Sequence, residues 1–140
     1  MSATDLAAGA EHEVRALHDF FVAWLTGRAP AGDLDRLTSA LHPDCVRIAP
    51  DGAVQDRDAI VAMLAGANGA LGPEFRIDIA LEATAPLADH TVLVRYVEHQ
   101  SSAADTTARR ATAIFVASPT SPGGVAWRWL QETWIDQTKA

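Results

Sequence analysis

Polar side chains inside the apolar strands expected near the C-terminus are the first candidates for chemistry. Successive side chains of a strand point to opposite sides, so Tyr96 and Glu98 share one face of their strand. Arg110 and Thr112 share a face of the next strand. An arginine that leads an apolar strand face has two interpretations. Its stem can pack while its head reaches solvent, or it can lie in a pocket, with Tyr96 or Glu98, and pair with a carboxylate or another anionic ligand.

The stretch WRWLQETW, residues 127–134, holds three of the four tryptophans of the chain. Alternation places Trp127, Trp129 and Gln131 on one face. It places Leu130, Glu132 and Trp134 on the other. Because both faces carry tryptophan, both are expected to be covered. One would meet the helices and a pocket, and the other would be covered by a second subunit, or else by a long loop or the N-terminal arm folded over it. We expect the face with Glu132 to line the pocket and the face with Trp127 to form a homodimer interface.

Neither metal chemistry nor nucleophilic catalysis has a motif in this chain. The stretch HEVRALH places His12 and His18 six residues apart, whereas two zinc ligands on one helix face need a spacing of four. The chain has one cysteine, Cys45, and no GxSxG elbow. We therefore expect no metal and no cofactor.

Composition limits the partners. The chain has 140 residues, of which 49% are hydrophobic, and this fits one soluble domain with a real core, residues 1–140. A formal charge of −7 repels phosphate backbones, so we expect no nucleic-acid partner. No apolar run is long enough to cross a membrane, and no basic-then-apolar leader begins the chain, so we expect a cytoplasmic protein without a membrane partner.

The periodicity of apolar residues changes along the chain. After an arm over residues 1–9, expected to be disordered or loosely packed, helical spacing predicts a helix over 10–26, whose stripe includes Trp24, a further pocket candidate. Asp33 and Asp56 are expected to cap two shorter helices. A period of two predicts a short strand and then four long ones; the five ranges are 45–50, 74–83, 90–100, 106–117 and 125–136. Helices followed by strands favour the α+β class, with helices on one face of a curved antiparallel sheet.

This order of elements resembles the nuclear-transport-factor-2-like (NTF2-like) superfamily, which includes ketosteroid isomerases, scytalone dehydratase and SnoaL-like cyclases. Three stretches are similar to family segments: LHPDCVRIAPDG, VQDRDAIVAML and RWLQETWI. The resemblance implies a cone-shaped barrel with three N-terminal helices, a pocket at its wide end, and homodimers through the outer sheet face. The family pattern R-x-T, matched by Arg110 and Thr112, favours the pocket interpretation of that arginine.

The resemblance also bears on activity. Where ketosteroid isomerases carry a catalytic aspartate before a proline, this chain has Ala49, which cannot abstract a proton. Many members carry histidines near the positions of Gln131 and Thr133. We expect a pocket for a small, largely apolar molecule, with or without a carboxylate or other anionic group. The alternatives are an isomerase, cyclase or dehydratase that uses polar pocket residues, and a module that only dimerises.

Overall fold

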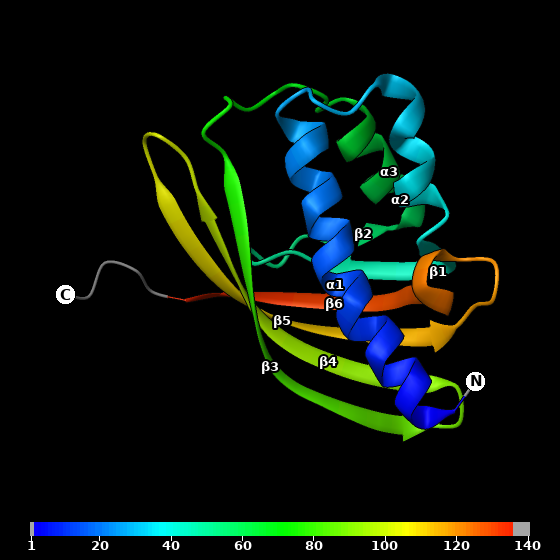
Figure 1. The fold of residues 1–140 in the computed structure, drawn as a ribbon. Helices are drawn as coiled ribbons and strands as arrows, with labels where there is room; N and C mark the ends of the chain where they lie inside the picture. The colour runs from blue at the N-terminus through cyan, green and yellow to red at the C-terminus, as the bar shows by residue number, and fades with distance from the viewer. Residues whose placement is uncertain (1, 136–140) are drawn as a thin grey trace.

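The computed structural model describes residues 2–135, and within them helices pack against one curled six-stranded sheet (Figure 1). The α+β class predicted from the order of helical and alternating segments is confirmed. The sheet curls around the helices without closing into a complete barrel.

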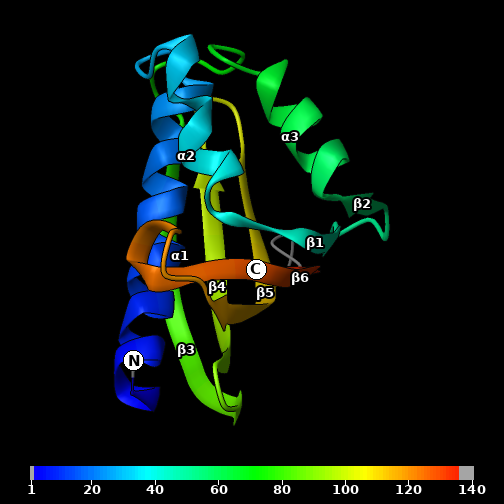
Figure 2. The ribbon, with the colours of Figure 1, turned by 90° about the vertical axis from the view of Figure 1, so that its right-hand side faces the viewer.

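Helix α1, Ala3–Leu25, is the longest helix and lies along the concave face of the sheet (Figures 1 and 2). It begins with a capping box in which the Ser2 hydroxyl accepts from the Asp5 amide at 3.1 Å while the Asp5 carboxylate accepts from the Ser2 amide. This cap, together with burial of Leu6, orders the segment that was expected to be a loose arm. Of the arm expected over residues 1–9, residues 3–9 are helical instead, because the cap satisfies the first backbone amides of α1.

The middle of the chain is compressed into short elements at one end of the sheet. A 3₁₀ turn, η1 (Ala31–Leu34), runs directly into α2 (Asp35–Thr38). Strand β1 then spans Leu41–Ile48 and pairs with β2, Val54–Asp56. The Asp56 carboxylate caps α3, Arg57–Ala65, by accepting from the Ala59 amide at 2.9 Å, as the sequence predicts.

Strand β1 begins at Leu41, before the predicted strand range of 45–50, and therefore runs through Pro43. The β1 ladder is interrupted between Leu41 and Val46, so Pro43 lies where no regular ladder hydrogen bond is required. The strand can therefore begin before the proline.

The remaining strands form the curved wall of the molecule. They are β3 (Arg76–Ala88), β4 (Thr91–Ser101), β5 (Thr106–Ala117) and β6 (Val125–Ile135), with the 3₁₀ turn η2 (Pro122–Gly124) before β6. The strand order is β2-β1-β6-β5-β4-β3. Every adjacent pair is antiparallel except β1 and β6, which are parallel, so the sheet is mixed. Two strands so far apart in sequence are joined by long crossing connections rather than a hairpin, which permits the parallel pairing.

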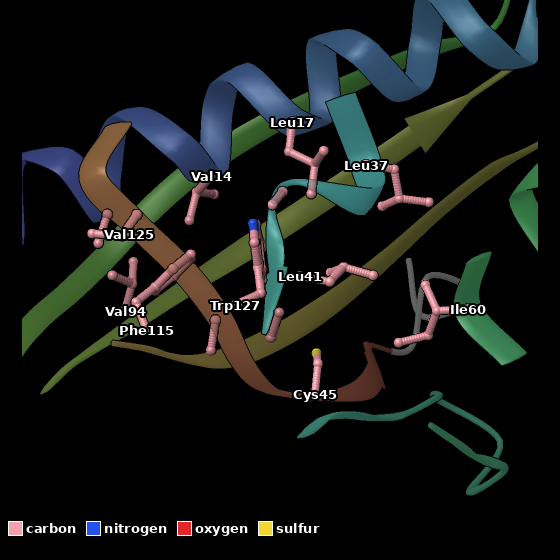
Figure 3. Close-up of a cluster of buried hydrophobic side chains, with 14 of the residues drawn as sticks. Val14, Leu17, Leu37, Leu41, Cys45, Ile60, Val94, Phe115, Val125 and Trp127 are labelled. Atoms are coloured by element: carbon pink, nitrogen blue, oxygen red, sulfur yellow. The ribbon is translucent and has the colours of Figure 1, made fainter. Parts of the chain in front are cut away.

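An irregularity in β6 decides which tryptophan points inward. Phe115 pairs with Trp127 and Ile114 pairs with Trp129, so Arg128 is an extra residue opposite the β5 strand. Trp127 therefore faces the helices together with Phe115, with the two ring centroids 4.5 Å apart. Figure 3 shows these two side chains in the apolar core with Val14, Leu17 and other residues of α1 and the sheet.

Candidate functional site

A cavity of about 360 Å³ lies between α1, α3 and the concave face of the sheet. This volume falls in the range of small-molecule sites, roughly 300–1,000 Å³. Most of its wall is apolar and comes from the helices and the turn after α3, where the lining includes Leu17, Phe21, Leu25, Ile60, Met63, Leu64, Ala67 and Leu71. Its polar lining consists of His18, Arg47, Glu98, Gln100, Arg109 and Glu132. The cavity is thus an apolar chamber with one charged region on the sheet side.

The sheet register gathers the charged residues. Side chains directly opposite on neighbouring strands are in contact range. One row across the sheet contains Glu98, Arg109 and Trp134, and the next row contains Tyr96, Ala111 and Glu132. The methyl group of Ala111 leaves space between Tyr96 and Glu132, and Ala111 is itself completely buried.

His18 and Glu98 form a buried pair that joins α1 to β4. His18 Nε2 lies 3.1 Å from Glu98 Oε1, and His18 Nδ1 lies 2.6 Å from the Val14 carbonyl oxygen. A carbonyl only accepts, so Nδ1 carries a proton, and an ionised Glu98 requires a proton on Nε2 as well. The geometry therefore assigns an imidazolium bound to a carboxylate.

The pKa directions agree with this assignment. Burial alone would lower the pKa of His18, but the charge of Glu98, its hydrogen bond and the Val14 carbonyl outweigh burial and raise that pKa. Burial alone would raise the pKa of Glu98, but the charge of His18 and hydrogen bonds from His18 and Gln100 bring it to about 2. Gln100 Nε2 donates to the second oxygen of Glu98 at 2.6 Å.

Glu132 is held by Arg47 from β1. Arg47 donates to Glu132 Oε1 through Nε at 2.8 Å, and its Nη2 lies 2.7 Å from the same oxygen. Arg47 Nη1 donates to Gln55 at 2.7 Å. Burial raises the pKa of Glu132 above its ordinary value, against the lowering by the charge of Arg47.

Arg109 has weaker partners than the other charged residues of the cavity. Its Nη1 lies 3.9 Å from Glu132 Oε2, beyond hydrogen-bond distance, and its guanidinium stands 4.7 Å from the centroid of the Trp134 ring. Among residues 2–135, the buried side-chain atoms without a hydrogen-bond partner are Arg109 Nε and the Tyr96 hydroxyl. Burial raises the pKa of Tyr96 well above its ordinary value, so Tyr96 is a neutral hydroxyl.

Three of the predicted pocket residues line the cavity: Glu98, Leu130 and Glu132. Two others are completely or almost completely buried beside it. The Trp24 indole donates to the Leu64 carbonyl at 2.6 Å and packs on Phe20. Tyr96 packs edge-on against His18, with ring centroids 5.6 Å apart.

Arg110 and Thr112 lie on the convex outer face, which corrects the expectation that they enter the pocket. Arg110 pairs with Glu82 through two hydrogen bonds of 2.9 and 3.1 Å, and its side chain is 49% exposed. The hairpin register opposes Glu98 to Arg109, so the neighbouring arginine occupies the inner face. The sequence carries no decisive signal here, because the face of Arg109 continues into Ala111, Ala113 and Phe115, while the face of Arg110 also continues into the apolar Ile114 and Val116.

The tryptophans of β6 also divide differently from the expectation. Trp127 is only 2% exposed and donates from Nε1 to Glu13 at 3.2 Å, so it is a core residue and not an interface residue. Trp129 and Gln131 lie on the outer face with Arg110 and Thr112. Trp134 lies two residues after Glu132 and so on the same face of β6, but it is 49% exposed and its ring stacks on the Arg109 guanidinium instead of lining the cavity.

Sequence reasoning missed His18, Arg47, Gln100 and Arg109 as cavity residues. The spacing to His12 speaks only against a zinc site; the sequence signal for His18 is its position four residues after Val14 and three before Phe21, on the apolar stripe of the first helix. In residues 2–135 there is no group of three or more His, Cys, Asp or Glu side chains arranged to hold a metal ion. Over the same residues, no helix is long and apolar enough to span a membrane.

The comparisons with known proteins agree on the fold. The family model described as "Sucrose-6-phosphate phosphohydrolase C-terminal" matches residues 10–136. No curated protein matches the sequence. An NTF2-like protein of unknown function from Pseudomonas aeruginosa is 28% identical, with a TM-score of 0.83 over 91% of this chain and 99% of that one.

Two more distant structures are similar in fold alone. An uncharacterised protein with a cystatin-like fold from Caulobacter vibrioides is 15% identical, with a TM-score of 0.65 over 93% of this chain and 92% of its own. The CaMKII hub of S. rosetta is 13% identical, with a TM-score of 0.66 over 96% of this chain and 98% of its own.

Proposed function

Because the chain belongs to the sucrose-6-phosphate phosphohydrolase C-terminal family, on an NTF2-like fold, we propose that it is a binding protein that holds a small, largely apolar molecule in the cavity between α1, α3 and the sheet. The observation that carries this proposal is the lining: an apolar chamber of about 360 Å³ in which both carboxylates, Glu98 and Glu132, already have close cationic partners. Such a chamber favours burial of an apolar body over chemistry on it.

The family description names a sugar phosphate, and that chemistry fits this cavity poorly. A sugar phosphate carries several hydroxyl groups, each of which needs a hydrogen-bond partner when it is buried. The helix side of the cavity offers leucine, isoleucine, methionine and phenylalanine side chains instead. We therefore do not propose a reaction on a sugar phosphate for this chain, although it belongs to the family.

Occupancy of the cavity is testable with the neutral fluorescent probe N-phenyl-1-naphthylamine. Replacing Ala67, which lines the cavity, with tryptophan fills part of the chamber. Ala62 is exposed on α3 and outside the lining, so Ala62→Trp is the matched control. We expect Ala67→Trp to weaken probe binding at least roughly tenfold and Ala62→Trp to leave it unchanged. Equal probe binding by both variants and the unmodified protein would contradict the proposal.

The alternative is an isomerase, cyclase or dehydratase that acts through polar pocket residues, and one observation favours it. Glu132 is buried, its pKa is raised, and the neutral hydroxyl of Tyr96 lies in the same row of the sheet, which is the pairing that proton abstraction beside a carbonyl needs. Hydrogen–deuterium exchange of cyclohexanone in D₂O, followed by NMR, tests it. Catalysed exchange that Glu132→Gln abolishes would favour the enzyme, and exchange at the buffer rate would favour the binding protein.

A second copy of the chain is the partner proposed for the outer sheet face. Trp129 and Ile114 are only partly buried there, and a shallow hollow of about 520 Å³ runs along them with Gln131 and Thr112. Exposed aromatic surface of this kind is typical of subunit contacts. Sedimentation velocity at micromolar concentration should show a dimer that Trp129→Glu converts to a monomer, whereas Val54→Glu, at an exposed site on β2, should not. A monomer without any substitution would refute the dimer.

The single cysteine supports a cytoplasmic location, since a chain with one cysteine forms no internal disulfide.

A further inference from the structure

The charges of the ionisable side chains that line the cavity do not sum to zero. Its lining contains three cationic side chains, His18, Arg47 and Arg109, and two carboxylates, Glu98 and Glu132. The difference is one positive charge when all five groups are ionised. A buried charge without a counterion is costly, so the identity of the remaining cation indicates what the cavity accepts.

Two of the cations are already matched by close contacts. His18 lies against Glu98 at 3.1 Å and Arg47 against Glu132 at 2.7 Å. The second oxygen of Glu98 is occupied by Gln100. Each carboxylate therefore has a partner of its own, from α1 in one case and from β1 in the other.

Arg109 is the cation that remains. Among residues 2–135 its one ion pair is with Glu132, at 3.9 Å, and its Nε has no hydrogen-bond partner. Glu98 lies opposite it on β4, and the charge of Arg109 helps to lower the pKa of Glu98, but the two side chains form no ion pair. Arg109 is 9% exposed, so bulk water does not solvate it in the way it solvates a surface arginine. Trp134 covers one face of the guanidinium, which leaves the in-plane N–H groups as its means of binding.

We propose that the molecule held in this cavity is a carboxylic acid with an apolar body, and that Arg109 binds its carboxylate. This inference rests on the proposed function, because it names the ligand class of the same cavity. A guanidinium presents two parallel N–H donors that match a carboxylate. One unmatched positive charge balances a monoanion, whereas a phosphate monoester carries nearly two negative charges at neutral pH. The leucine, isoleucine and phenylalanine side chains opposite the charged region supply the surface for the apolar body.

The test uses two probes with the same apolar chain and head groups of similar shape, the charged octanoate and the neutral octanamide, with affinities measured by isothermal titration calorimetry. The unmodified protein should bind octanoate at least roughly tenfold more tightly than octanamide, which is the effect expected of a charge-assisted hydrogen bond. Arg109→Gln should bring the ratio of the two affinities to about one by weakening the binding of octanoate. Arg110→Gln is the matched control, because Arg110 is the adjacent arginine on the outer face, and it should keep the full preference.

The outcomes separate this inference from the proposed function. Equal binding of octanoate and octanamide by the unmodified protein would refute the carboxylate assignment and leave an apolar binding site. Binding of neither probe would count against both. A full preference for octanoate in Arg109→Gln would exclude Arg109 as the binding group. If circular dichroism shows that Arg109→Gln does not fold, Arg109→Met decides instead, because it also removes the charge and keeps an unbranched side chain. A full preference for octanoate in that variant would exclude Arg109 as the binding group.

Discussion

The buried pair between His18 and Glu98 predicts a specific response to loss of its cation. Replacing His18 with leucine leaves the Glu98 carboxylate buried beside apolar residues, with only Gln100 as a donor. The pKa of Glu98 lies at about 2, against an ordinary value of 4.5. At about 1.4 kcal/mol per pKa unit, the net interaction that favours the charged form is worth about 3 kcal/mol. Breaking a buried ion pair by removing one partner costs a similar amount, about 3–5 kcal/mol.

The pH dependence of the stability follows from the pKa shifts of His18 and Glu98. Both shifts come from the same ion pair, so its contribution to the free energy of unfolding is counted once. The pKa of Glu98 is lowered on folding, so its contribution is present above about 4.5 and is lost as the pH falls toward 2. The pKa of His18 is raised, so its contribution is complete below 6.5 and is lost as the pH rises through the folded value. The pair therefore stabilises the protein most between about pH 4.5 and 6.5.

Urea denaturation followed by circular dichroism measures the effect. His18→Leu should lower the free energy of unfolding by about 3 kcal/mol at pH 6. At pH 3.5, one unit below the ordinary pKa of Glu98, the loss should be smaller by at least about 1.4 kcal/mol. His12→Leu is the matched control, because His12 is exposed on the same helix, and it should change stability little at either pH.

A double substitution makes the test sharper. His18→Leu with Glu98→Leu leaves no stranded charge, so it should recover most of the stability that the single substitution loses. The reasoning is refuted if His18→Leu costs less than about 1 kcal/mol at pH 6, or if its cost is the same at both pH values.

Three further predictions concern the scaffold. A Cβ at Gly9 in α1 would lie 2.6 Å from the Gly123 carbonyl oxygen, so Gly9→Ala should lower the melting temperature although alanine favours helices. Gly32 is the control, because a Cβ there would meet nothing within 4 Å, and Gly32→Ala should be tolerated. A higher melting temperature for Gly9→Ala would contradict the close contact. Burial raises the pKa of Cys45 to about 11, so 5,5′-dithiobis(2-nitrobenzoate) should label it at pH 8 only after urea is added, and rapid labelling of the folded protein would count against a buried thiol. Asp56→Ala removes the cap of α3 and should cost about 1 kcal/mol in denaturation experiments, whereas no loss would mean that the cap is not formed in solution.

The elements of the fold could be read from local patterns. The period of two predicted the four long strands to within a few residues at most of their ends, and the apolar stripe with Leu17 and Trp24 predicted the body of α1. These patterns are reliable because each reflects one face turned toward a core. The stripe does not mark the start of α1, because the signal there is the cap formed by Ser2 and Asp5.

The identity of the charged cavity residues was not accessible in the same way. Alternation separates Arg109 from Arg110 but does not say which of them faces inward; the register with Glu98 decides that. Strict alternation also gave the wrong face for Trp127. The extra residue Arg128 in β6 shifts the residues before it to the opposite face of the sheet.

The sequence by itself determined the class of fold, a formal net charge of −7, and a short set of polar residues as pocket candidates. The tertiary structure alone decided which of them meet. His18 and Glu98 are 80 positions apart, and Arg47 and Glu132 are 85 apart. The physical reason is that local periodicity depends on neighbouring residues, whereas a buried charge is matched across the curled sheet by whichever strand or helix brings its counterion within about 3 Å.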